Sequence, residues 1–272
     1  MIFIAVDIPL VGLPKIIKGN LDIQNWEDAI RAILYSPPAQ QKYVAIKSTF
    51  PVDHKSHIVD ILHGYDHSEL LHVITIPEFF SEGTALDDLT NLPKIVMGGF
   101  FNSDQITKEL FRDLYVRLVH NDHERIEYIT SKSSVEIGKC LSNASIAAQL
   151  TIMDIGSSIC DRVGANFRDV KSTIESHPRM NNPFFHDSRS GYGGLGLIKD
   201  VAYLAYLCDC VGLVNEKKFF IMINEMRIAK MDELVRNIAQ GLERLSLYMG
   251  FQTKLIPMMF ESLLPSIFPD HY

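Results

Sequence analysis

Short apolar runs alternate with stretches of helical spacing in the N-terminal part of the chain. The runs MIFIAVDIP, KYVAIKSTFP, LHVITIPEFF and KIVMGG are rich in β-branched residues and predict short buried strands. Between the first two runs, Trp26, Ile30 and Ile33 recur at helical spacing and predict a helix over residues 26–35. A polar helix is expected near residues 55–62. This alternation predicts a parallel α/β sheet covered on both faces.

Beyond about residue 104 the strand signal fades and the apolar spacing becomes that of helices. Over residues 134–163, apolar positions recur three and four apart and predict one long amphipathic helix; they are Ile137, Leu141, Ala144, Ala148, Ile152, Ile155 and Ile159. Its alanines allow close packing against another helix. A helix of this length often spans two domains or forms a dimer interface.

Two further helices are predicted, near residues 199–211 and from about 216 to 249, and an apolar tail with several prolines follows. Such a tail is expected to dock on another surface. The pattern as a whole predicts two domains: a partial α/β domain over residues 1–130 and a helical domain over residues 131–272.

Composition excludes some functions. The chain of 272 residues carries 26 basic and 33 acidic side chains, a formal charge of −7, which gives no basic surface for nucleic acid or anionic membranes. No apolar run approaches the roughly 20 residues needed to cross a bilayer. The N-terminus also lacks the features of a signal peptide, so we expect a cytoplasmic protein whose four cysteines are reduced.

Two groups of residues raise the question of a metal site. The first contains five histidines that lack the tight spacing of zinc motifs, namely His54, His57, His63, His67 and His72. The second is Cys208 and Cys210, which flank Asp209 in an apolar helix and point in different directions. We therefore expect solvated histidines, core cysteines and no bound metal.

Three segments, read in order, carry a more specific pattern. The first is AIKSTFPV, the second is IPEFFSEGTALDDLTNLPKIVMGG, and the third is EIGKCLSNA followed by HPRMNNPF and GYGGLGLIKD. In order and spacing, from Met1 to about Val211, they resemble the UDP-glucose/GDP-mannose dehydrogenase family. The resemblance implies a dinucleotide-binding domain, a helical central domain that dimerises through the long helix, and a C-terminal nucleotide-sugar domain.

By this resemblance the chain is expected to be truncated at both ends. The opening run resembles the fourth strand of the family's first sheet, so we expect half of a Rossmann-like parallel sheet followed by an all-α dimerisation domain. No Gly-x-Gly-x-x-Gly turn follows an N-terminal strand, and GYGGLG is assigned to the sugar site. Although the family uses NAD, we therefore expect no cofactor here.

The family's nucleophile is also missing at its matched position. In the family, a cysteine in Gly-Gly-x-Cys attacks an aldehyde, and the adduct is oxidised to a thioester that water releases as the acid. Gly196 occupies the cysteine position in GYGGLGLIKD. Cys208 and Cys210 lie about two or more helical turns beyond Asp200, too far along the helix to replace it.

Other positions match the family's functional residues. Glu78 matches a general acid or base for thioester hydrolysis, and Thr49 and Asp200 match groups that position water. Lys139 and Asn143 match an oxyanion-binding pair and lie four residues apart, on one helix face. Four further residues match the family's substrate-binding positions, namely Arg179, Gly193, Gly194 and Lys199. In the family, the arginine at the position of Arg179 reaches a ligand across the dimer.

Each of these residues also has a purely structural interpretation. Glu78 could be a buried carboxylate bonded to backbone, Asp200 could cap the helix that starts there, and Thr49 could simply end a strand. The Lys139 and Asn143 pair could be the edge of a solvated face. The glycines of the third segment favour a tight turn with positive φ over a phosphate cradle: Gly191, Gly193 and Gly194.

We therefore expect a non-oxidising family member that acts through dimerisation or through protein or nucleotide-sugar binding. The alternative is a nucleotide-sugar dehydrogenase of the UDP-glucose 6-dehydrogenase type, or a non-redox enzyme acting on a nucleotide sugar, so whether the chain is an enzyme stays open. The expected partners are a second copy through the helix over residues 134–163, a full-length family enzyme, or another protein at the strand edge over residues 1–8.

Overall fold

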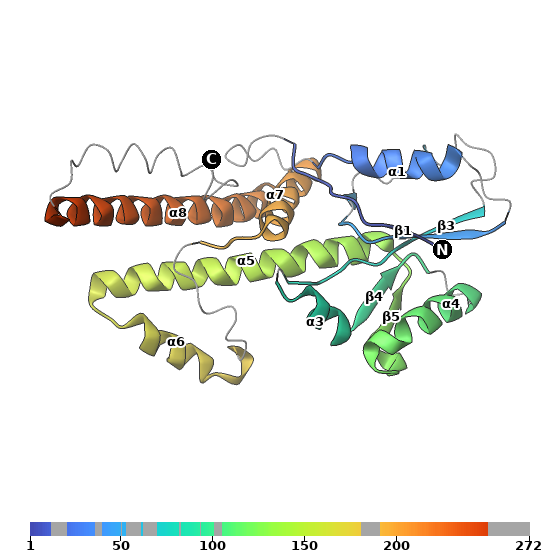
Figure 1. Cartoon of the computed structure of the whole chain (residues 1–272), viewed down its shortest axis with the longest axis horizontal. Helices are drawn as coiled ribbons and strands as arrows, with labels where there is room; N and C mark the ends of the chain where they lie inside the picture. The colour runs from blue at the N-terminus through green and yellow to red at the C-terminus, as the bar shows by residue number, and fades with distance from the viewer. Residues whose placement is uncertain are drawn as a thin grey trace. The chain divides into compact units, whose positions relative to one another are not determined.

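The structure is a computed structural model (Figure 1), which describes residues 1–11, 21–35, 40–49, 51–52, 61, 70–81, 83–92, 94–100, 105–180 and 191–249. The chain divides into two compact units. The first unit holds the described residues up to Ser142, and the second holds those from Asn143 onwards. The helix expected near residues 55–62 and the apolar tail after residue 249 lie outside the described residues.

The first unit is built on a sheet of five strands in the order β1-β2-β3-β4-β5. The strands are β1 (Ile2–Ile4), β2 (Lys42–Ile46), β3 (Leu71–Thr75), β4 (Ile95–Gly98) and β5 (Ile126–Ile129). The first four lie in the predicted apolar runs, which places β-branched residues in the interior of the sheet. β5 was not expected from the sequence, because its segment IEYI is short and lies between helical stretches.

The sheet is mainly parallel. β1, β2 and β3 pair in parallel, with Ile4 opposite Ile46 and Ile46 opposite Thr75. β4 pairs antiparallel with β3 through one residue pair, Thr75 and Gly98, and β5 is parallel to β4. The change of direction at β4 was not visible in the sequence. The predicted fold class, part of a Rossmann-like sheet followed by a helical region, is confirmed.

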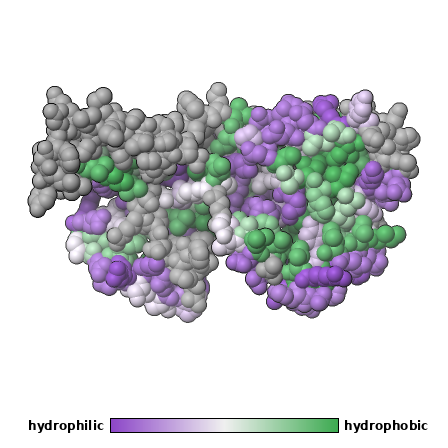
Figure 2. Space-filling model, in the orientation of Figure 1, coloured by the Kyte–Doolittle hydropathy of each residue, from purple (hydrophilic) through white to green (hydrophobic). Residues whose placement is uncertain are grey.

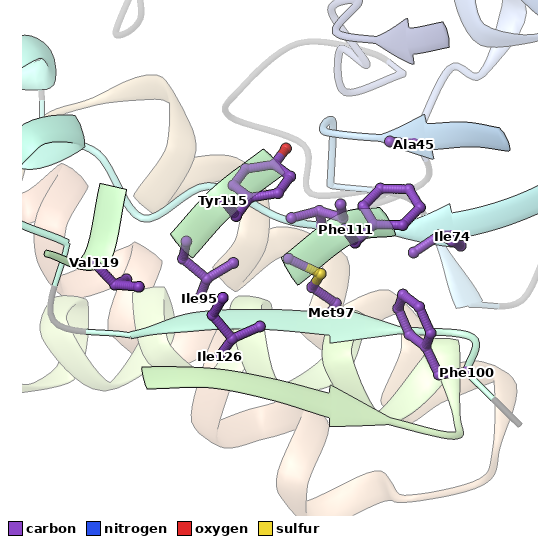
Figure 3. Close-up of a cluster of buried hydrophobic side chains, with 10 residues drawn as sticks. Ala45, Ile74, Ile95, Met97, Phe100, Phe111, Tyr115, Val119 and Ile126 are labelled. Atoms are coloured by element: carbon purple, nitrogen blue, oxygen red, sulfur yellow. The ribbon is translucent and has the colours of Figure 1, made fainter. Parts of the chain in front are cut away.

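Helices complete the first unit. α1 (Gln24–Tyr35) buries Trp26, as its spacing predicts, and α3 is Ala85–Thr90. α4 (Gln105–Tyr115) leads into two 3-10 turns, η3 (Val116–Val119) and η4 (His123–Arg125). The core formed by α4 and the strands is shown in Figure 3 and comprises Ala45, Ile74, Ile76, Ile95, Met97, Phe100, Phe111, Tyr115, Val119 and Ile126.

α5 (Lys132–Val163) begins in the first unit and continues into the second. In the first unit the Thr75 hydroxyl at the end of β3 donates to the buried Glu136 carboxylate of α5. The observed bounds of α5 are close to the predicted range of residues 134–163. The long-helix prediction is therefore confirmed.

The second unit is helical. After α5 come α6 (Phe167–Glu175), η5 (Pro178–Met180), α7 (Leu195–Cys210) and α8 (Val214–Met249). A small core joins α5 to α6, while α7 packs against α8. No helix in the described part of the chain is both long enough and apolar enough to cross a membrane.

Candidate functional site

The carboxyl ends of β2 and β3 bring the first group of candidate residues together in the first unit. Because Ile46 and Thr75 are paired in parallel register, the residues that follow these strands lie at the same edge of the sheet. The Ile76 N–H donates to the Ile46 carbonyl at 2.8 Å, which holds this register beyond the strand ends. Lys47 and Glu78 therefore emerge at one edge.

A serine fixes the end of β2 against the segment after β1. The Ser48 Oγ donates to the Val6 carbonyl at 2.6 Å and accepts from the Val6 N–H at 2.9 Å. Thr49 follows directly and is partly buried at the same edge. Ser48 thus ties the end of β2 to the segment after β1, and Thr49 is the next residue along the chain.

Glu78, Lys47 and Lys139 form a charged cluster at this edge. The Lys139 side chain is buried, with only 6% of the residue exposed, and its ammonium lies 4.7 Å from the centroid of the Phe79 ring. The Glu78 Oε2 accepts from the Phe80 N–H at 2.6 Å, so this carboxylate does bond to backbone. A cavity of about 30 Å³ is lined in part by Lys47, Glu78 and Phe79.

Lys47 is a member of this cluster that the sequence did not single out. Burial lowers the pKa of Lys47 to about 8, the Glu78 carboxylate opposes that shift, and the Lys139 ammonium adds to it. The signal available in the sequence was a lysine placed directly after a buried strand, in AIKSTFPV.

In the second unit the fold brings Asn143 and Asp200 together. Asn143 Nδ2 donates to Asp200 Oδ2 at 2.6 Å, and Asp200 is 1% exposed. The helix that carries Asp200 begins at Leu195, so Asp200 lies in its second turn and does not cap it. The capping interpretation is wrong because α7 starts five residues earlier than Asp200, after Gly194.

Position 196 faces this pair. A Cβ atom built on Gly196 would lie 3.8 Å from Asn143 Nδ2, an ordinary contact, and would meet no other described atom within 4 Å. The backbone there is helical, so neither packing nor conformation requires glycine. The position can therefore hold a side chain, yet it offers no nucleophile.

The cysteines on α7 do not replace that nucleophile. Cys208 is buried, and burial raises the pKa of its thiol. Cys210 is exposed rather than part of the core, because α7 ends there. Both lie at the far end of the helix that begins beside Gly196.

Two helices of the second unit anchor the glycine segment before α7. The Gly191 N–H donates to Asp154 Oδ2 on α5 at 3.1 Å, and the Arg227 guanidinium on α8 lies 5.7 Å from the Tyr192 ring centroid. Gly191 and Gly194 have φ of 81° and 87°, which favours glycine. Gly193 has no positive φ, so the expected strained turn does not extend to it.

Lys199 and Arg179 differ in their placement. Lys199 lies on α7 next to Asp200 and is partly buried. Arg179 lies in η5, is exposed, and its side chain makes no hydrogen bond or ion pair with the residues that the structure describes. Lys199 therefore adjoins Asp200 in the chain. The Arg179 backbone N–H donates to His177 Nδ1 at 3.3 Å, whereas its side chain has no bonded partner among the described residues.

A dinucleotide cofactor needs a glycine-rich turn that leads from a strand into a helix. Among the described residues, β1, β2 and β3 are followed by Ala5, Lys47 and Ile76, whereas β4 is followed by Gly99. The Gly191–Gly196 segment does contain the glycine spacing, but its first N–H is bound by the Asp154 carboxylate, whose charge opposes a pyrophosphate. This segment is therefore not a pyrophosphate cradle, and the absence of a cofactor stays a prediction.

The histidines considered as metal ligands are mostly not described. His54, His57, His63 and His67 lie outside the described residues. The His72 ring centroid lies 5.4 Å from that of Tyr43. Within the described part of the chain, no group of three acidic, histidine or cysteine side chains is placed to hold a metal ion.

The chain is similar to a set of curated dehydrogenases. UDP-glucose 6-dehydrogenase 1 of Glycine max is 30% identical over 229 residues, which cover 83% of this chain and 47% of that protein. UDP-glucose 6-dehydrogenase 3 of Arabidopsis thaliana is 27% identical over 243 residues, 89% of this chain and 50% of that one. The chain spans about half the length of the curated relatives it matches.

Solved structures share the fold. A UDP-glucose dehydrogenase from Pyrobaculum islandicum matches with a TM-score of 0.69 at 21% identity, over 89% of this chain and 52% of that one. A UDP-D-ManNAc dehydrogenase from Pyrococcus horikoshii matches with a TM-score of 0.66 at 22% identity, over 91% and 53%. At these identities the likeness concerns the fold alone.

Two family models match the chain, and their descriptions agree. The NAD binding domain model matches residues 1–119, and the central domain model matches residues 133–234. By these two matches, the chain belongs to the UDP-glucose/GDP-mannose dehydrogenase family.

Proposed function

We propose that this chain binds a nucleotide sugar and does not carry out the NAD-dependent oxidation for which its relatives are named. The observation that carries the proposal is Gly196, which lies beside the bonded Asn143 and Asp200 at the family's cysteine position. This position is internal to the matched central domain, so the argument does not depend on where the chain begins or ends.

The chemistry explains why one residue matters so much. Oxidation of an aldehyde to an acid through a thioester needs a thiolate that adds to the carbonyl and keeps the hydrogen that leaves as hydride. Glycine has no side chain, and the cysteines at the other end of α7 are too far along the helix to act at position 196. Binding groups can survive that loss, since they act through hydrogen bonds and charge.

The buried polar residues support a role in binding. Asp200 and Lys139 are both buried, and a buried charge is costly unless other groups compensate it. An apolar pair in their place would fold at lower cost. Retention of Lys139, Asn143 and Asp200 at family-matched positions therefore favours recognition of a polar ligand.

A calorimetric titration of UDP-glucose into the protein tests the recognition. We expect saturable heats for the wild type, and about a tenfold or greater loss of affinity for Asn143→Ala, because the hydrogen bond that holds the Asp200 side chain in place is removed. Asn166→Ala, which removes the cap of α6 in the same unit, serves as the matched control and should keep the affinity. Absence of any heat with the wild type would contradict the proposal.

A homodimer through α5 is a second proposal, and it follows from exposed apolar residues in the second unit. On α5, Ile152 and Ile159 are 64% and 55% exposed, and on α8 Met222 is 59% exposed. A groove of about 340 Å³ runs between the two helices, and its charged lining residues carry both signs, namely Asp154, Arg162, Lys230 and Glu233. Apolar faces of this kind mark association sites, and one with both charges can complement a second copy.

Mass measured by light scattering tests the dimer. Ile155→Lys, which places a charge on the exposed face of α5, should yield a monomer. Ile106→Lys on α4 is the matched control, because Ile106 is also exposed but belongs to the first unit, and it should leave the dimer intact. A monomeric wild type would exclude this assembly.

Two further partners are proposed for the first unit. β1 is an edge strand of the described sheet, and Phe3 on it is 47% exposed, so an extended segment of a second protein could pair there. Figure 2 shows hydrophobic residues at the surface of this unit among hydrophilic ones.

A full-length family enzyme could instead pair through α5. Phe3→Lys should abolish capture at the strand edge and leave pairing through α5 unchanged. We also propose a cytoplasmic location, which is supported by four described cysteines that form no disulfide bond with one another.

A further inference from the structure

We propose that Arg227 of α8 is a positioning residue for nucleotide-sugar binding, because it holds in place the segment that Gly191 and Tyr192 form before α7. The inference rests on the proposed function, since it names a residue that sets the affinity of that site without touching the ligand. All the groups that it involves belong to the second unit.

α8 itself fixes the orientation of the Arg227 side chain. Arg227 is buried, with 2% of the residue exposed. Its Nε donates to Asn224 Oδ1 at 3.3 Å, and its Nη1 donates to Met231 Sδ at 3.1 Å. Asn224 lies three residues before Arg227 on the helix and Met231 four residues after it, so both are neighbours on the same face. The planar guanidinium is therefore held on two sides by its own helix.

The ring of Tyr192 receives this guanidinium. The Arg227 Cζ lies 5.7 Å from the Tyr192 ring centroid, and Tyr192 is also buried, with 2% of the residue exposed. Burial raises the pKa of Tyr192 to about 12, although the Arg227 charge opposes that shift, so the phenol is neutral at pH 7. The contact therefore joins a cation to a neutral ring, and such contacts are strongest where water is excluded.

Gly191 packs against the same arginine. A Cβ atom built on Gly191 would lie 3.1 Å from the Arg227 carbonyl oxygen and 3.3 Å from its Cγ, and the φ of Gly191 is 81°. From the other side, the Gly191 N–H donates to Asp154 Oδ2 on α5 at 3.1 Å. In Figure 1 the segment that leads into α7 accordingly runs between α5 and α8. Arg227 is the contact of this segment with α8.

The next residue, Gly193, shows why this placement matters for a ligand. Gly193 is exposed and has no positive φ, and a Cβ atom built on it would meet no described atom within 4 Å. Packing among the described residues does not explain a glycine there, whereas close approach of a ligand to the backbone does. Gly193 lies between Tyr192 and Gly194, the N-cap of α7. The backbone that a ligand meets is therefore placed by the contact between Arg227 and Tyr192.

Calorimetric titration of UDP-glucose into two variants tests the effect on the ligand. Arg227→Met removes the guanidinium, and we expect about a tenfold or greater loss of affinity, because the ligand must then order the segment. Arg227→Lys keeps a cation for the Tyr192 ring and should lose only about threefold. Arg236→Met is the matched control, since Arg236 is exposed on the same helix, and its affinity should stay within about twofold of the wild type.

Amide hydrogen exchange without ligand tests the positioning itself. Nuclear magnetic resonance reads the Gly191 N–H, and the Val170 N–H, which bonds to the Asn166 carbonyl in α6, is the reference. In Arg227→Met we expect exchange at Gly191 to become about tenfold faster relative to that at Val170, because the segment opens locally. A general loss of stability would accelerate both amides alike and leave their ratio unchanged.

The outcomes separate this inference from the proposed function. An affinity of Arg227→Met within about twofold of the wild type, or an unchanged exchange ratio, would overturn the inference while leaving nucleotide-sugar binding intact. So would an Arg227→Lys variant as weak as Arg227→Met, because the cation would then not be what holds Tyr192. If Arg227→Met does not fold by circular dichroism, Arg227→Lys is judged by the same affinity and exchange ratio. If the wild type binds no UDP-glucose, the proposed function is wrong, and the exchange ratio still decides whether Arg227 holds the segment.

Discussion

Substitution of Gly196 by alanine tests whether this position tolerates the side chain that the family pattern expects. A Cβ there meets only Asn143 Nδ2, at 3.8 Å, and the residue lies in the first turn of α7 without a positive φ. Glycine costs a helix about 1 kcal/mol relative to alanine, and somewhat less in a terminal turn. Gly196→Ala should therefore stabilise the protein by about 0.5–1 kcal/mol, or roughly 1–4 °C in melting temperature.

Gly194→Ala is the matched control for that experiment. Gly194 lies two residues away, at the N-cap of α7, and has φ of 87°. An alanine there should destabilise the protein by about 1–2 kcal/mol, because a side chain opposes left-handed backbone. Urea unfolding followed by circular dichroism measures both variants. A loss of stability in Gly196→Ala comparable to that in Gly194→Ala would refute the inference that neither packing nor conformation requires glycine at position 196.

Two other predictions concern the buried charges. Asp154→Ala should weaken UDP-glucose binding and lower the free energy of unfolding by about 1–3 kcal/mol, because the Gly191 N–H loses its acceptor. Asp161→Ala is the control, since Asp161 is exposed on the same helix, and it should change neither the affinity nor the free energy of unfolding. Lys47→Met should stabilise the protein at pH 7, where the folded state must hold a partly buried cation. The pKa of Lys47 is about 8 in the folded protein and 10.5 in a free lysine. As the pH rises from 8 to 10.5, the free energy of unfolding of the wild type should therefore increase by about 3 kcal/mol relative to that of the variant. A difference between the two proteins that stays constant from pH 7 to 10.5 would count against the buried-lysine account.

The sequence predicted those elements in which local pattern and tertiary position agree. The long helix and the first four strands have a strong apolar period, and the structure confirms them. β5 has only four residues, and the antiparallel pairing of β4 rests on the single contact between Thr75 and Gly98. Neither feature leaves a periodic signal in one sequence.

The candidate site, too, was predicted from the sequence only in part. The resemblance drew attention to Asn143 and Asp200, but the hydrogen bond between them joins residues 57 positions apart and depends on how α5 meets α7. The start of α7 at Leu195, which removes Asp200 from a capping role, was set by Gly194 and its positive φ. Lys47 was missed because its importance comes from burial near Glu78 and Lys139, which no local pattern encodes.

The central claim is that the chain recognises a nucleotide sugar but does not oxidise it. A calorimetric titration of UDP-glucose into the wild-type protein in the presence of NAD tests both parts at once. The account predicts saturable heats that return to the baseline after each injection. Either the absence of binding heat or a sustained heat flow from turnover, accompanied by reduced NAD, would contradict it.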